Sequence, residues 1–292
     1  MSRAAWSAPR SGNATDFALG TLIGLYAVSR VLQLFAGRVP TLAVVAFHVI
    51  PAALFALLHG ALRYRLSGIL AFFTICLLVA GISENVGVWT GYPFGRYYFT
   101  DLMGPKILVV PVFLALAYVG MGYISWTLGR IIIGDASLPL TRQMIVTVPL
   151  VASFLMVAWD IAMDPVWSTV MHAWIWLDGG PYFGVPISNF FGWYLINFVI
   201  YVVFALYLRR RSDLSTHLPS QYWFSAVLFY AISAGGNILL LIPRPGPRVV
   251  FDPAGVQWRV AYITANAAVI SVFTMGGFAL IAGLRVFDRK TR

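Results

Sequence analysis

Residues 83–106 read SENVGVWTGYPFGRYYFTDLMGPK and lie between two long apolar runs. The stretch is therefore expected to contain the end of one membrane helix and the loop that leads to the next. Glu84 still belongs to the apolar run, while the loop gathers aromatic side chains around Gly91, Pro93 and Gly95. A carboxyl group at the end of an apolar helix, covered by aromatics on a stiff loop, predicts chemistry on an apolar molecule.

The composition is that of an integral membrane protein. Of the 292 residues, 60% are hydrophobic and 10% are charged, whereas soluble domains carry about 25% charged residues. A spanning helix needs about 20 apolar residues, and apolar runs of that order occupy residues 17–36, 40–60, 67–88, 106–128, 143–162, 188–208, 221–242 and 258–284. Backbone groups in lipid must be satisfied within their own segment, so these runs are helices. We predict a single all-α membrane domain over residues 1–292, a polytopic bundle of about eight transmembrane helices.

The basic residues predict the orientation of the bundle. With eight spans, one side of the membrane holds both termini and 13 basic residues: Arg3, Arg10, Arg63, Arg65, Arg130, Arg142, Arg209, Arg210, Arg211, Arg285, Arg289, Lys290 and Arg292. The other side holds 7: Arg30, Arg38, Arg96, Lys106, Arg244, Arg248 and Arg259. Positive charge favours the cytoplasmic side, so both termini are predicted to be cytoplasmic. The loops at 89–105, 163–187 and 243–257 then share the opposite face. The net charge of +10 indicates topology and contact with membrane lipid, and it gives no reason to expect nucleic acid.

Glu84 is the first candidate for chemistry. An ionisable side chain inside a span is costly, which makes it a candidate for function by default. Desolvation favours the protonated form of a carboxyl group, as a general acid requires. The structural alternative is a side chain that snorkels or caps, because Glu84 lies about one turn from the predicted interface.

Asp160 and Asp164 form the second candidate. They are four residues apart and share a face if the helix continues that far. Pro165 is expected to end the helix or to disfavour helical geometry at Asp164, and in that case Asp164 is a turn residue and only Asp160 is buried. Two nearby carboxyl groups favour one protonated and one ionised member, which suits an acid and base pair. The pair is expected where the chain leaves the membrane, with water nearer to it than to Glu84.

A third signal covers residues 172–193, HAWIWLDGGPYFGVPISNFFGW. Trp174 and Trp176 alternate with apolar neighbours before Asp178-Gly179-Gly180, which is typical of a short strand and turn, or else of a lid lying in the interface. An aromatic belt at the membrane surface is the alternative. Aromatic faces also stabilise carbocations by cation–π attraction. Asn189 is expected to be either a helix cap or a polar contact of the site.

Several absences narrow the chemistry. The chain has no Asp-rich pair of the type that holds magnesium diphosphate, no phosphate-binding loop and no dinucleotide glycine fingerprint. It also lacks His-rich boxes and Cys–His metal spacings. Three acids could hold a divalent metal, but no pattern around them supports one. We therefore predict no cofactor and no metal, which argues against a desaturase, a membrane hydroxylase or an ATP-driven pump.

The motifs resemble those of one known family. They are TGYPFGRYY at 90–98 after Glu84, Gly104-Pro105, Trp159-Asp160, Asp164-Pro165, GPYFGVP at 180–186, Asn189-Phe190 and Gly192-Trp193. On these blocks the chain resembles the membrane carotenoid biosynthesis family, that of CruF-type carotenoid 1,2-hydratases and bisanhydrobacterioruberin hydratases. The resemblance runs from the third to the sixth predicted helix, and Arg244-Pro245-Gly246-Pro247 has no counterpart in it.

The resemblance implies a hydro-lyase that hydrates the terminal C=C of an acyclic carotenoid end group, in lycopene, γ-carotene or a C50 precursor, to a tertiary alcohol. By motif position, Glu84 would donate the proton, and Asp160 or Asp164 would be the base that positions water. The expected substrate-binding residues are Trp89, Tyr92, Phe94, Arg96, Tyr97, Tyr98, Trp159, Trp167, Tyr182, Phe183, Asn189 and Trp193.

The resemblance also implies a multi-pass protein of a bacterial or archaeal cell membrane. Its expected partners are a carotenoid in the bilayer, membrane lipid and other carotenoid pathway enzymes. One alternative is a carotenoid cyclase or isomerase, which uses the same acid without adding water. The other is a lipid or carotenoid transporter or binding protein, for which inverted repeats are typical; none is visible in the sequence.

Overall fold

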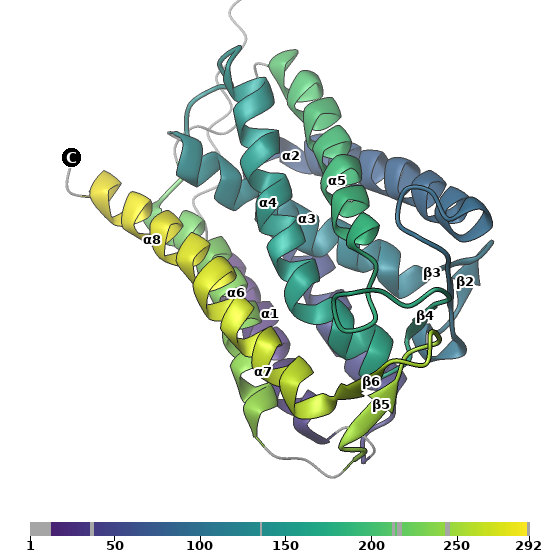
Figure 1. The fold of residues 1–292 in the computed structure, drawn as a ribbon. Helices are drawn as coiled ribbons and strands as arrows, with labels where there is room; N and C mark the ends of the chain where they lie inside the picture. The colour runs from purple at the N-terminus through teal and green to yellow at the C-terminus, as the bar shows by residue number, and fades with distance from the viewer. Residues whose placement is uncertain are drawn as a thin grey trace, which may run out of the picture.

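The computed structural model is an all-α membrane bundle and describes residues 13–35, 38–134, 136–211, 214, 218–242 and 246–290. Within these ranges, seven helices are long and apolar enough to cross a membrane. The helical elements are α1 (Asn13–Leu32), η1 (Gln33–Phe35), α2 (Thr41–Thr90), η2 (Asp101–Met103), α3 (Val112–Ile133), α4 (Met144–Pro165), η3 (Val166–Val170), α5 (Ile187–Arg209), α6 (Ser220–Ile238), η4 (Leu239–Leu241), α7 (Val260–Ile270), η5 (Ser271–Gly276) and α8 (Gly277–Lys290). In Figure 1, α3 and α4 lie between α5 on one side and α6 to α8 on the other.

The 50-residue helix α2 is two spans joined by one residue. A straight helix of that length would measure about 75 Å, more than twice the hydrocarbon core of a bilayer. Arg65 breaks the helix with φ 58° and ψ 167°. The chain reverses at this point, because a Cβ atom built on Gly60 would come within 2.4 Å of the Ile69 side chain, a contact that a straight helix would not allow. The predicted total of about eight spans is therefore confirmed, although a single residue replaces the loop expected between residues 60 and 67.

Two other predicted boundaries are wrong. The fourth apolar run was expected to become helical at residue 106, but residues 106–111 form a hairpin of β2 (Lys106–Ile107) and β3 (Val110–Pro111), and α3 begins at Val112. The fifth run was expected to end near residue 162. Instead α4 continues through Pro165 into the π-helical turn η3.

Three loops gather at one end of the bundle, as the charge argument predicts. Strand β1 (Tyr97–Phe99) pairs antiparallel with β4 (Trp174–Trp176), which joins the loop after α2 to the loop after α4. Strands β5 (Val249–Phe251) and β6 (Gln257–Arg259) form a hairpin beside them, and Trp258 of this hairpin packs on Phe183 with ring centroids 5.4 Å apart. Figure 1 shows all the strands at the same end of the helices. Arg244 and Pro245 lie outside the described residues.

We expect this end to face away from the cytoplasm. In Asp101→Cys, the exposed thiol should react with a membrane-impermeant reagent added outside intact cells. In Leu138→Cys, at the opposite end, the thiol should react only after the membrane is opened. Asp101 and Leu138 are both exposed, while the native thiol of Cys76 is buried and stays protected. Labelling of position 101 from the cytoplasmic side alone would contradict the predicted orientation.

Candidate active site

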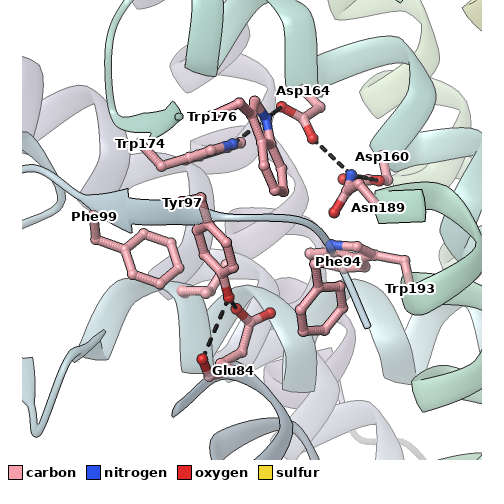
Figure 2. Close-up of a pocket in the computed structure, with 11 residues that line it drawn as sticks. Glu84, Phe94, Tyr97, Phe99, Asp160, Asp164, Trp174, Trp176, Asn189 and Trp193 are labelled. Carbon is pink, nitrogen blue, oxygen red and sulfur yellow. Dashed lines mark hydrogen bonds between the residues drawn. The ribbon is translucent and has the colours of Figure 1, made fainter. Parts of the chain in front are cut away.

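A small cavity lies where α2, α3, α4 and α5 meet the ribbon formed by β1 and β4. Its volume is about 20 Å³, counted as the space open to the centre of a water-sized sphere, which is enough for a water molecule. Figure 2 shows the carboxyl groups and rings that surround it. The lining residues are Glu84, Phe94, Tyr97, Phe99, Leu114, Asp160, Asp164, Trp174, Trp176, Asn189 and Trp193.

Glu84 lies in the last two turns of α2 and is 3% exposed. The Tyr97 hydroxyl donates to its Oε2 at 2.5 Å, and the Tyr118 hydroxyl of α3 donates to its Oε1 at 2.6 Å. Burial, helped by the neighbouring Glu84, raises the pKa of the Tyr97 hydroxyl, which therefore stays protonated and remains a donor. Glu84 is thus held by two phenols, and it neither snorkels nor caps.

The chain reverses tightly after Glu84 to bring Tyr97 over it. Helix α2 ends at Gly91, whose φ of 79° lies in the left-handed region that glycine tolerates. Gly87 lets the returning chain approach the helix, because a Cβ atom there would lie 2.7 Å from the Phe94 ring and 3.0 Å from the Tyr97 hydroxyl. Two glycines, one at the turn and one at the close approach, therefore fix the geometry of the acid and its phenol.

Asp160 and Asp164 lie on successive turns of α4 and are both 1% exposed. The Asn189 amide of α5 donates to Asp160 Oδ2 at 3.0 Å and to Asp164 Oδ2 at 2.8 Å. The helix continues through Pro165, so the two aspartates share a face and Asp164 is not a turn residue. Proline cannot donate to the carbonyl four residues earlier, and that carbonyl, on Ile161, instead accepts from the Tyr182 hydroxyl at 3.2 Å.

The ribbon of β1 and β4 forms the aromatic roof of the cavity. Successive side chains of a strand point to opposite faces, so Tyr97 lies inside, opposite Trp176, with ring centroids 4.9 Å apart. The indole nitrogens of Trp174 and Trp176 donate to Asp164 Oδ1 at 3.1 and 3.2 Å. The predicted strand at Trp174 is confirmed, and it connects the two stretches that the sequence singles out.

The expected contrast between a dry Glu84 and wetter aspartates is wrong. All three carboxyl groups line one cavity and all are buried. The prediction places Asp164 where the chain leaves the membrane and meets water. In the structure, the ribbon of β1 and β4 and the loop that contains Tyr182 cover that end of α4. Burial alone therefore assigns no separate roles to the three acids, and their hydrogen-bond partners must do so.

The predicted substrate-binding residues fall into three groups. Phe94, Tyr97, Asn189 and Trp193 line the cavity, and Trp159 lies behind Trp193 with ring centroids 6.2 Å apart. Trp167, Tyr182 and Phe183 lie nearby but contact His48, Ile161 and Trp258 instead. Trp89, Tyr92, Arg96 and Tyr98 are exposed and lie outside the cavity.

Arg96 makes an ion pair outside the cavity. Its partner is Asp178, which follows β4, and the bond joins the two strands at one end of the ribbon. The Arg96 guanidinium holds the pKa of the Asp178 carboxyl below its ordinary value. Both side chains are exposed, so the pair contributes little to stability.

Five residues that the structure places at the site are absent from the predicted set of substrate-binding residues. Phe99, Trp174 and Trp176 carry a signal in the sequence, since each sits at an alternating position of a strand. Tyr118 and Leu114 carry none, because the rotation of α3 about its axis decides which of its residues face Glu84. Among the residues that the structure describes, no group of three or more His, Cys, Asp or Glu side chains is placed to hold a metal ion.

Comparing an aromatic residue inside the cavity, Tyr97, with one outside it, Trp89, tests whether the cavity is the site of the reaction. Tyr97→Leu should lower turnover by about tenfold or more, because it removes a ring from the cavity and a hydrogen bond from Glu84. Trp89→Leu should leave turnover nearly unchanged, because Trp89 is 63% exposed. Product formation per mass of purified protein measures both. Equal losses would point to an aromatic belt at the membrane surface.

Fold and site together define a polytopic membrane protein with a buried triad of acids beneath an aromatic roof. The chain belongs to the carotenoid biosynthesis protein family, whose model matches residues 39–245 and so contains the whole site. It is also similar to the bisanhydrobacterioruberin hydratase of Haloarcula japonica, with 29% identity over 144 residues, which are 49% of this chain and 46% of that protein. The match thus spans about half the length of the relative. No solved structure matches the chain.

Proposed function

We propose that the protein is a carotenoid hydratase, which adds water to the terminal C=C of an acyclic carotenoid end group and gives a tertiary alcohol. The observation that carries the proposal is one small cavity with three buried carboxyl groups and aromatic walls. Membership of the carotenoid biosynthesis family and the similarity to a named hydratase support it.

Hydration of an alkene needs a proton donor, a surface that stabilises a cation and a group that handles water, and the cavity contains candidates for all three. A proton added to the less substituted alkene carbon leaves a tertiary cation on the other carbon, and water then attacks that cation. Aromatic faces stabilise such a cation by about 0.5–2 kcal/mol each when they are desolvated. Glu84 is the proton donor in this scheme, and the aspartate pair handles the water. Neither step changes an oxidation state that would need a redox cofactor.

Substrate access requires the site to open. The cavity of about 20 Å³ holds a water molecule but has no room for the branched end of a carotenoid. The end group therefore reaches the acids only when lining side chains move apart, and the polyene chain stays in the bilayer. Closure around the bound end group would keep bulk water from the cation.

Expression in a lycopene-producing host tests the proposal. Pigments extracted from the cells should include a carotenoid heavier by one water for each modified end, and cells with the empty vector should lack it. A pigment of unchanged mass and altered retention would indicate a cyclase or isomerase instead. Unchanged pigments with acyclic C40 and C50 substrates would contradict a hydratase and favour a transporter or binding protein.

A further inference from the structure

The hydrogen bonds distinguish the two aspartates, although their burial does not. Asp164 Oδ1 accepts from two indoles, and its Oδ2 accepts from Asn189. Both oxygens of Asp164 are therefore occupied by donors. Asp160 accepts through Oδ2 alone, and its Oδ1 is buried without a hydrogen-bond partner.

A second unpaired acceptor lies beside it. The Nδ2 atom of Asn189 donates to both aspartates, so the Oδ1 atom of the same amide points away from them. That oxygen is also buried without a hydrogen-bond partner. The bonds to two carboxyl groups fix this orientation, because a flipped amide would set an oxygen against both. Two unpaired acceptors thus line the same cavity as Glu84.

Each of these two oxygens requires a hydrogen-bond donor, and one molecule with two hydrogens to donate can serve both. Buried polar groups are nearly always paired with protein or with ordered water. A water molecule has two O–H groups to donate, and the cavity has room for one water molecule. No donor from the described protein reaches either oxygen.

We infer that Asp160 Oδ1 and Asn189 Oδ1 hold the nucleophilic water by its two hydrogens, and that Asp160, rather than Asp164, is the base. The inference rests on the proposed hydration. A water that donates both hydrogens keeps its lone pairs free, and these can point into the cavity where the cation forms. Asp164 acts as a positioning residue, because its two oxygens accept from Asn189 and the two tryptophans and hold them in place.

The step balances without another reactant. Glu84 gives its proton to the alkene carbon and becomes a carboxylate. The water oxygen bonds to the tertiary cation, and the proton it shares with Asp160 passes to Asp160 Oδ1, which leaves a neutral alcohol. One water has been added, and the proton on Asp160 returns to Glu84 through exchanging water before the next turnover.

Turnover in D₂O separates water attack from protonation. The cation can also lose a proton back to Glu84, so recovered carotenoid takes up deuterium even when no alcohol forms. Asp160→Asn and Asn189→Leu should each lower alcohol by about 10²-fold or more, while deuterium uptake into recovered or isomerised carotenoid stays near the native level. Mass spectrometry of the extracted pigments measures both products in one sample.

Asn197→Leu is the matched control. It removes another buried amide from α5, one that donates only to the Trp193 carbonyl within its own helix, and it should leave the ratio of alcohol to deuterium uptake unchanged. Equal loss of alcohol and deuterium in Asp160→Asn would overturn the inference, as would alcohol at the native level. Should Asn189→Leu fail to fold, Asp160→Asn alone decides. Native protein that neither hydrates nor exchanges would overturn the proposed function itself.

Discussion

Glu84→Gln is expected to lower alcohol formation by about 10²–10⁴-fold, the usual contribution of a general acid. Glutamine keeps the shape of the side chain and removes the transferable proton. Deuterium uptake from D₂O should disappear together with the alcohol, because no cation forms. This pattern differs from that of Asp160→Asn, in which only the alcohol is lost.

The fold should survive this change. A tyrosine hydroxyl both donates and accepts, so Tyr97 and Tyr118 can each bond to the amide that replaces the carboxyl group. Tyr118→Phe is the control, since it keeps the ring stacked on Trp193 at 4.5 Å and leaves the proton on Glu84. It should lose far less activity than Glu84→Gln. Near-native turnover by well-folded Glu84→Gln would exclude Glu84 as the donor.

Asp164→Leu is expected to cause the largest loss of stability at the site. It leaves three buried N–H groups without an acceptor, those of Trp174, Trp176 and Asn189, at a cost of about 1–3 kcal/mol each. Asp160→Leu leaves one such group and should cost correspondingly less. The thermal unfolding midpoint in detergent compares the two variants. An equal or smaller shift for Asp164→Leu would contradict the role of Asp164 as the fixed centre of the polar network.

The helices were predictable because their apolar runs are long and lipid admits few other structures. Their ends were not, since local chemistry decides them. The reversal at Arg65 requires a positive φ, and the residue types around position 65 do not predict one. Proline usually breaks a helix, but α4 continues through Pro165 because the Tyr182 hydroxyl donates to the Ile161 carbonyl, to which Pro165 cannot donate. Tyr182 lies in a later loop, so the local sequence does not predict this contact.

The acids of the site were predictable because a carboxyl group in an apolar helix is rare and costly. Glu84, Asp160 and Asp164 do share one cavity. The aromatic residues were harder to place, because Trp89 and Trp176 look alike in a sequence, and only strand pairing decides which one faces inward. The distinction between Asp160 and Asp164 depends on donors from β4 and α5, so the sequence had to leave both as possible bases.

In the proposed reaction, the oxygen of the product comes from water. Purified protein in lipid vesicles should be given an acyclic carotenoid in H₂¹⁸O under ordinary air, and the product mass should be compared with that formed in unlabelled water. We predict an alcohol that carries one ¹⁸O at each modified end. An alcohol without the label, or a modified carotenoid with no added oxygen, would contradict hydration at this site.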